Sequence, residues 1–216
     1  MAEPINHALR QYIEENILPR YDGFDKAHQR DHVLMVIGQS QEIAEQLGDV
    51  NADMVYAIAA YHDTGLCEGR DRHHEVSARI IRGDQNLRRW FTEEQIGIMA
   101  EAVEDHRASS GHEPRSIYGR IVAEADRFID ADTIIRRTIQ FGLDHYPELD
   151  GEEHFQRMVS HLREKYGRGG YLHLWFDDSP NAQRLRLLQD TIDDEAMLRR
   201  LFNQYFNHEN IKYEKA

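Results

Sequence analysis

A histidine and an aspartate stand side by side at the end of an apolar stretch of the sequence. The segment AIAAYHDTG, residues 57–65, places His62 and Asp63 directly after small and apolar residues. An unpaired carboxylate is very costly to remove from water, so Asp63 needs a compensating partner. A bound cation is one such partner, because imidazole nitrogens and carboxylate oxygens are common metal donors. If Asp63 binds a cation, further donors must come from other parts of the chain.

Two other segments offer donors in comparable settings. His32 lies in AHQRDHVLMV at the expected start of a helix, and Asp126 lies in IVAEADRFID among apolar residues. A metal ion takes four or more donors, and two neighbours on a helix are about 100° apart around its axis. The remaining donors must therefore come from other helices, and the arrangement of those helices decides whether a site forms.

Apolar residues recur with helical spacing almost throughout the sequence. This periodicity predicts helices over residues 5–18, 31–47, 51–64, 73–83, 92–106, 116–143, 151–167 and 181–206. Thr92 and Gln95 form a helix-start signature, and a bend is expected near Asp130. The nearest approach to a strand pattern, GGYLHLWF at 169–176, is short and isolated. The sequence therefore predicts an all-α fold.

The composition is that of a globular chain, and we expect one domain over residues 1–216. A net charge of −13 argues against an extended nucleic acid as partner, since such binding relies on a basic face. No apolar stretch approaches the roughly 18 residues that span a bilayer, and the first residues lack a signal-peptide pattern. A single cysteine, Cys67, excludes an intrachain disulfide. We expect a cytoplasmic protein without a membrane partner, and a homo-oligomer is compatible with the sequence.

The order of these motifs resembles the HD superfamily of metal-dependent phosphohydrolases, which is named for the His-Asp doublet. AHQRDHVLMV resembles its first-ligand helix, AAYHDTG its doublet helix, and HHEVSARII a following helix that starts with histidine. AVEDHRAS and IVAEADRFIDAD resemble its last two motifs, with Glu124 where relatives often have aspartate. The resemblance covers about residues 20–135. It implies an HD-domain helical bundle, with residues 145–216 as a C-terminal helical extension.

The resemblance also implies a metal site made of His32, His62, Asp63 and Asp126. Such a mixed nitrogen and oxygen site suits a divalent Mn, Fe, Co, Ni, Zn or Mg ion. The implied reaction is hydrolysis of a phosphoester by metal-bound hydroxide.

The site can hold either one metal ion or two. Relatives with two ions use two further histidines, and His74 and His106 are the candidates here. We expect one ion, with Asp63, His74 and His106 as the catalytic residues around it; a second ion held by the two histidines is the alternative. His73 is expected to be exposed, and His28 to lie at the surface or behind the ligands.

Arginines near these motifs are candidates for binding phosphate, which their planar guanidinium recognises well. Arg70 and Arg72 lie in the polar loop CEGRDRHH after the doublet, and Arg107 follows His106. The resemblance thus implies a phosphomonoesterase or phosphodiesterase that acts on a small phosphorylated metabolite or nucleotide. Two alternatives stay open: a non-catalytic module that binds a metal or ligand, and a di-iron oxygenase, which requires both ions.

Overall fold

The computed structural model describes residues 4–25, 28–107, 112–127 and 129–213, and over these residues the ordered elements are all helices. The all-α prediction is confirmed, and residues 169–176 form a loop and not a strand. The chain divides into two compact units, Met1–Arg127 and Phe128–Ala216, and each is considered by itself. None of the described helices is both long and apolar enough to cross a membrane.

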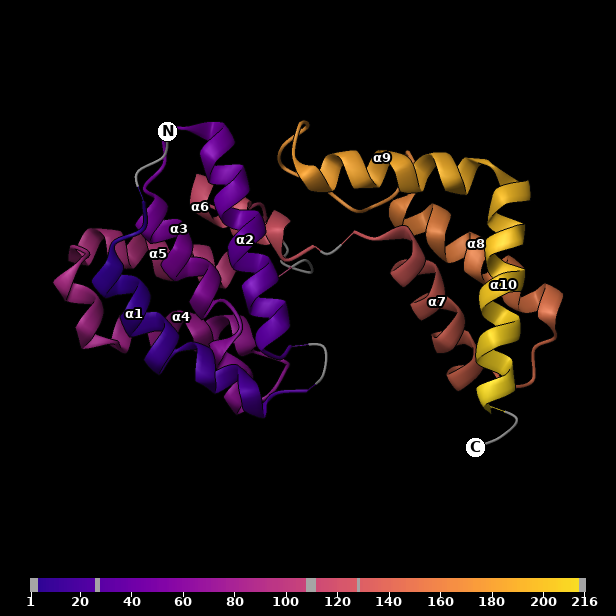
Figure 1. Ribbon diagram of the computed structural model, residues 1–216, viewed down its shortest axis with the longest axis horizontal. Coiled ribbons are helices and arrows are strands. Elements are labelled where there is room, and N and C mark those ends of the chain that lie inside the picture. Colours follow the sequence, from indigo (N-terminus) through magenta and orange to yellow (C-terminus); the bar gives the residue numbers. More distant parts are fainter. Residues whose placement is uncertain (1–3, 26–27, 108–111, 128, 214–216) are drawn as a thin grey trace. The chain divides into compact units, whose positions relative to one another are not determined.

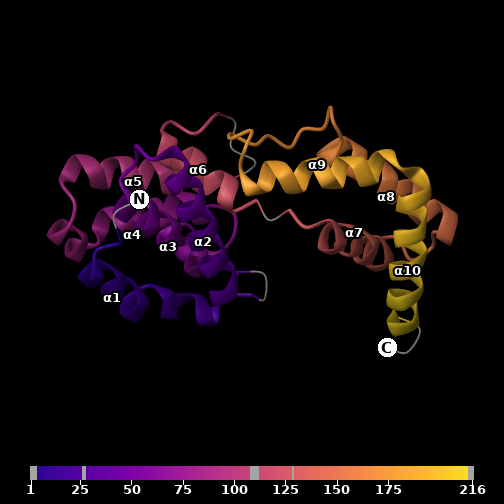
Figure 2. The same cartoon turned by 45° about the horizontal axis from the view of Figure 1, so that its top comes forward.

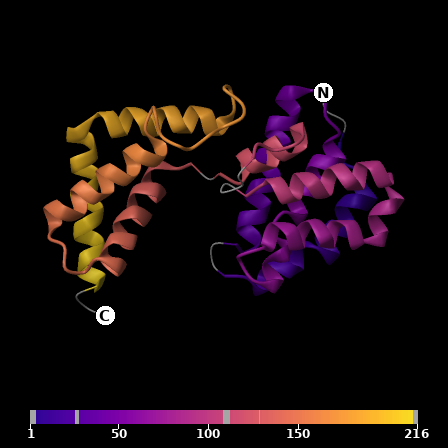
Figure 3. The ribbon, with the colours of Figure 1, turned by 180° about the vertical axis from the view of Figure 1, so that it is seen from behind.

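The first unit contains α-helices joined by short 3₁₀ helices. Its elements are α1 (His7–Asn16), η1 (Leu18–Gly23), α2 (Arg30–Leu47), α3 (Ala52–Tyr61), η2 (Thr64–Glu68), α4 (His73–Gly83), η3 (Gln85–Arg89), α5 (Glu93–Asp105) and α6 (Ile117–Ala125). Figure 1 labels the helices, and Figure 2 shows α1 along the outside of this unit. Figure 3 shows α4 and α5, which pack side by side, from behind.

Helix α3 is the buried centre of the first unit. The Asn51 side chain caps its start by accepting a hydrogen bond from the N–H of Met54, and every residue from Met54 to Tyr61 is buried. The helix packs against α1, α2, α5 and α6 (Figure 1). A helix that is apolar on all sides belongs in a core. Because α3 ends at Tyr61, the next two residues, His62 and Asp63, lie in the interior of the unit.

A half-buried carboxylate ties α3 to α1. Tyr12 of α1 and Tyr61 of α3 both donate their hydroxyls to Oδ2 of Asp84, at 2.5 and 2.6 Å. Burial alone would raise the pKa of Asp84, but these hydrogen bonds and those from Asn86 lower it. The three side chains hold the outer helix against the end of the central one.

The long helix predicted over residues 116–143 is two helices, α6 and α7 (Ala131–His145). The expected bend near Asp130 is a break, because the Asp130 side chain caps the start of α7 by accepting from the N–H of Thr133 at 2.8 Å. The predicted start of α5 is confirmed as a capping box between Thr92 and Gln95. The break leaves Asp126 at the end of α6, where its carboxylate is not confined to one face of a continuous helix.

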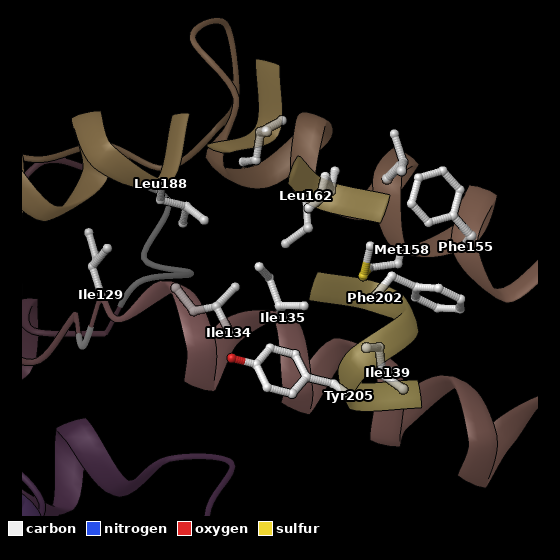
Figure 4. Close-up of a cluster of buried hydrophobic side chains, with 13 residues drawn as sticks. Ile129, Ile134, Ile135, Ile139, Phe155, Met158, Leu162, Leu188, Phe202 and Tyr205 are labelled. Carbon is white, nitrogen blue, oxygen red and sulfur yellow. The ribbon is translucent and has the colours of Figure 1, made fainter. Parts of the chain in front are cut away.

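The second unit consists of α7, α8 (Gly151–Tyr166), α9 (Pro180–Asp193) and α10 (Glu195–Tyr213), as far as the described residues extend. These helices bury one apolar cluster, shown in Figure 4. Ile135 and Ile139 of α7 face Met158 of α8 and Phe202 of α10 across it. This unit therefore has a hydrophobic core of its own.

Candidate metal centre

Six side chains with metal-donor atoms converge in the first unit, each at or next to the end of a helix. His32 and His73 lie in the first turns of α2 and α4, whereas His62, His106 and Asp126 cap the C-terminal ends of α3, α5 and α6. Asp63 follows His62 and precedes η2. The helices that carry them pack against one another, with the end of α3 at the centre.

The first group of donors brings together the residues of the predicted ligand set. Nε2 of His32 and Nε2 of His62 are 3.2 Å apart. Oδ2 of Asp63 lies 3.6 and 3.3 Å from these two nitrogens, and Oδ1 of Asp126 lies 3.1 and 3.7 Å from them. His32, His62 and Asp63 thus form one compact donor group, and Asp126 lies beside its two histidines.

A second group of donors lies on the other side of the same carboxylate. Nε2 of His73 and Nε2 of His106 are 3.1 Å apart, and each lies 3.4–3.5 Å from Oδ1 of Asp63. In each group, the ligand atoms of Asp63 and its two histidines lie within 4.8 Å of one another. Asp63 therefore presents one oxygen to His32 and His62, and the other oxygen to His73 and His106.

These separations fit ligation of divalent ions. Two nitrogens bound at about 2.0–2.1 Å to one ion, with an angle of about 90–110° between the bonds, lie about 2.8–3.4 Å apart. The observed nitrogen pairs are 3.2 and 3.1 Å apart. Imidazole together with carboxylate suits Zn and the neighbouring transition ions. The donor set can therefore hold one ion in each group, with Asp63 shared between them.

Three of the histidines are oriented by the same local hydrogen bond. Nδ1 of His62, His73 and His106 lies 2.7, 2.8 and 2.5 Å from the backbone carbonyl oxygen three residues earlier in the chain. A carbonyl can only accept, so Nδ1 carries the proton and Nε2 keeps its lone pair when the ring is neutral. Such hydrogen bonds fix the ring and the tautomer of metal-binding histidines. Each Nε2 is thereby directed toward Asp63 in a form that can bind a cation.

The imidazoles also compensate the carboxylates of Asp63, which is buried, and of Asp126, which is partly buried. Burial alone would raise the pKa of Asp63, whose side chain is 5% exposed, but His62, His106 and His32 hold it well below its ordinary value. Burial would likewise raise the pKa of Asp126, and His32, His62 and His106 lower it. Burial would lower the pKa of His32, yet Asp126 and Asp63 raise it to about 9. Both carboxylates are therefore charged at neutral pH.

A close backbone contact brings the two donor groups together. The N–H of Gly65 donates to Oγ of Ser77 in α4 at 2.8 Å. A Cβ at residue 65 would lie 2.1 Å from the carbonyl oxygen of His73 and 2.6 Å from the nitrogen of Ser77. Only glycine lets the segment after the doublet approach the start of α4 this closely, and that approach places His73 beside Asp63.

The expectation that His73 is exposed is wrong. Its side chain is only 13% exposed and belongs to the second donor group, whereas His74 lies outside that group with its ring centroid 5.6 Å from that of His73. His73 is four residues before Ser77, so both lie on the face of α4 that meets the doublet segment. This spacing does not by itself separate the two histidines, because His74 is three residues before Ser77; the close contact of Gly65 with the start of α4 selects His73.

A cavity of about 310 Å³ opens beside the cluster. Its lining consists of His28, Asp63, Leu66, Arg70, His73, His106, Arg107 and Asp126. Of the predicted substrate-binding residues, Arg70 and Arg107 are thus at the cavity. Arg72 is not in this lining; its side chain is 76% exposed and pairs with Glu75 one helical turn away. His28 is at the cavity too, and its Nδ1 lies 2.9 Å from both carboxylate oxygens of Asp25.

Replacing Gly65 with alanine tests this close approach. Because the new Cβ meets backbone atoms that cannot rotate away, we expect Gly65→Ala to lower the free energy of unfolding by about 1–3 kcal/mol. Gly97→Ala is the matched control, since no atom lies within 4 Å of a Cβ built there, and alanine in a helix should be neutral or stabilising. Urea unfolding followed by circular dichroism measures both. Equal stability of the two variants would contradict the account of Gly65.

Comparison with known proteins agrees with this geometry. Residues 30–130 match the family model of the HD domain, a range that contains all six donors of the two groups. No curated protein and no solved structure matches the chain. The match, with the His-Asp doublet inside it, supports an HD domain over residues 30–130 of the chain.

Proposed function

We propose that this chain is a metal-dependent phosphohydrolase that binds two divalent ions, bridged by Asp63, and acts on a small phosphorylated molecule. The observation that carries the proposal is the position of Asp63, whose two oxygens face two separate pairs of histidines. The expectation of one ion, with His74 as a pocket residue, is replaced here by two ions with His73 in the second group.

The chain's own residues would hold and orient these ions. His32, His62, Asp63 and Asp126 would bind one ion, and His73, His106 and Asp63 the other. When bound, such ions lower the pKa of water toward neutrality and polarise a phosphoryl oxygen. Because three of the six ligands are buried and three are hydrogen bonded to backbone carbonyls, they need little reorganisation to act.

Two arginines supply a site for phosphate oxygens. Arg70 and Arg107 line the cavity beside Asp63 and Asp126. Nη1 of Arg107 donates to the backbone carbonyl of Asp71 at 2.6 Å, which anchors one end of the guanidinium. Arginine is suited to planar recognition of phosphate, so these two side chains would neutralise the substrate next to the ions.

The size of the cavity supports a small substrate. Its volume of about 310 Å³ lies at the lower end of the roughly 300–1,000 Å³ that is usual for ligand pockets. A phosphorylated metabolite or a mononucleotide is of this scale, and a polymer would have to extend beyond it. A nucleotide is thus one member of the proposed substrate class.

His28 is the residue available to protonate the leaving group. Asp25 engages its Nδ1, so Nε2 is the nitrogen free to exchange a proton. His28 lines the cavity, and its ring lies edge-on to that of His32 with centroids 5.7 Å apart. A histidine oriented by a carboxylate beside the reacting centre is a common general acid.

The di-iron oxygenase alternative is supported by one observation, the second donor group. An oxygenase of this kind needs both ions, and Asp63, His73 and His106 provide a place for the second. Oxygen uptake by the iron-loaded protein, tested with the same panel of phosphorylated compounds, distinguishes it from a hydrolase, which consumes no oxygen.

The number of bound ions is the first prediction of this proposal. We expect two Mn²⁺ or Co²⁺ ions per wild-type chain, and one in His73→Ala or His106→Ala, because either change leaves the second group with two donors. Elemental analysis of equilibrated and desalted protein measures this. His74→Ala is the matched control and should keep both ions. A single ion in wild type, or loss of an ion only in His74→Ala, would contradict the two-ion site.

Hydrolysis itself is the second prediction. Protein loaded with Mn²⁺, Co²⁺ or another divalent ion should release phosphate from p-nitrophenyl phosphate or from members of a mononucleotide panel. Chelation with EDTA, or Asp63→Ala, should lower the rate by on the order of 10³-fold or more, since the ions contribute several kcal/mol to catalysis. Asp49→Ala, at an exposed aspartate, should keep the wild-type rate. Stoichiometric metal without turnover on any phosphoester would favour the non-catalytic binding module.

The third prediction concerns His28. Its replacement by alanine should slow hydrolysis of an alkyl phosphate, whose leaving group needs a proton, by about 10²-fold. Hydrolysis of p-nitrophenyl phosphate, whose leaving group needs no proton, should change much less. His7→Ala, at an exposed histidine of α1, serves as the control. If both substrates slowed equally in His28→Ala, the residue would not act as the proton donor.

A further inference from the structure

A buried tyrosine hydroxyl lies directly behind the His-Asp doublet. Tyr21 of η1 is fully buried, and its Oη donates to the backbone carbonyl of Ala60 at 2.9 Å. The same oxygen accepts a hydrogen bond from the backbone N–H of Asp63 at 3.2 Å. Its ring centroid is 6.3 Å from that of His62. One side-chain oxygen from a distant segment thus contacts the backbone on both sides of His62.

The hydrogen bond to Tyr21 changes the usual pairing of backbone N–H and carbonyl groups at the end of α3. In a continuing α-helix the N–H of Asp63 would donate to the carbonyl of Ala59. Here that N–H donates to Tyr21, and the carbonyl of Ala59 accepts instead from Nδ1 of His62 at 2.7 Å. Tyr21 therefore provides the acceptor that allows the Ala59 carbonyl to serve the imidazole. The backbone of Asp63 has left the helix, with φ −107° and ψ 5°.

We infer that Tyr21 is a positioning residue for the metal centre, because its hydroxyl holds the backbone of Asp63 and leaves the carbonyl that orients His62 free for that role. The inference rests on the proposed metal site and does not depend on which reaction the site catalyses. The positions of two ligands of the first ion depend on this hydroxyl. It holds the backbone of Asp63 directly, and it leaves the carbonyl of Ala59 free to orient His62.

The second ion should depend on Tyr21 much less. His73 and His106 have their own anchors, the carbonyls of Arg70 and Val103. Neither carbonyl contacts Tyr21 through a hydrogen bond in the described structure. Among the described residues, the hydroxyl reaches the second group through the shared carboxylate of Asp63 and through the contact of the His62 ring with that of His106, whose centroids are 5.2 Å apart. Loss of the hydroxyl should therefore lower the affinities of the two ions unequally. A general loss of core packing would lower both affinities alike.

Tyr21→Phe keeps the ring and removes the hydroxyl, so it isolates this role. The N–H of Asp63 would then compete with Nδ1 of His62 for the carbonyl of Ala59. We expect one of the two Co²⁺ ions to bind about 10–100-fold more weakly, the range found for removal of a group that supports a metal ligand. Calorimetric titration with Co²⁺ measures this, and the visible absorption of bound Co²⁺ should shift because the ligand geometry changes.

Tyr61→Phe is the matched control. Tyr61 is also fully buried, but its hydroxyl donates to Asp84 and not to the doublet. We expect Tyr61→Phe to leave both Co²⁺ affinities and the absorption spectrum as in wild type, even where its thermal stability falls as far as that of Tyr21→Phe. Equal weakening of Co²⁺ binding in both variants, or unchanged affinity and spectrum in Tyr21→Phe, would overturn the inference.

The failure of the proposed function is seen separately, in the wild-type protein. Wild type that binds Co²⁺ but hydrolyses no phosphoester contradicts the hydrolase, and a selective loss in Tyr21→Phe would still support the positioning role. Wild type that binds no Co²⁺ contradicts the metal centre and overturns the inference with it.

Discussion

The buried carboxylate of Asp63 is the constraint on which the rest of the first unit depends. It lies at the end of an entirely buried helix, and such a charge is stable only with close compensation. Four imidazole nitrogens within 3.3–3.6 Å of its two oxygens provide it. To bring four histidines to one carboxylate, the starts of α2 and α4 and the ends of α3 and α5 must meet. The packing of these helices around α3 follows from that requirement as much as from their apolar faces.

Helix ends suit this task because they carry unsatisfied backbone groups. The last carbonyls of a helix have no partner within it, and at α3 and α5 the carbonyls of Ala59 and Val103 accept from the imidazoles of His62 and His106. Three C-terminal ends, those of α3, α5 and α6, meet at the cluster with two N-terminal ends, those of α2 and α4, so the partial negative charges outnumber the positive ones and favour a cation there. The same backbone groups thus orient the ligands and contribute to the potential that would hold an ion.

Periodicity in the sequence predicts most of the helices, because burial of an apolar stripe decides where they form. It wrongly joins α9 and α10 into one helix over residues 181–206, whereas α9 ends at Asp193 and α10 begins at Glu195. It also located Asp63 and Asp126, since a carboxylate among apolar residues is conspicuous. It failed at His73 because the direction of a side chain in the first turn depends on where the helix begins and on the close approach at Gly65. The position of Arg72 in a polar loop predicts a contact with substrate, whereas in the structure Arg72 pairs with Glu75. Local pairs of this kind depend on side-chain rotamers that periodicity does not encode.

The distribution of charge reconciles an acidic protein with the proposed anionic substrate. The chain carries a net charge of −13, yet the cavity lining contains two arginines and three histidines against two carboxylates. A small anion that reaches the cavity meets this local excess of basic groups at short range, where screening is weak. A long polyanion would extend past the cavity onto the acidic exterior and be repelled there. The same charges that would draw the proposed phosphate group toward Asp63 and its histidines would therefore favour substrates that fit within the cavity.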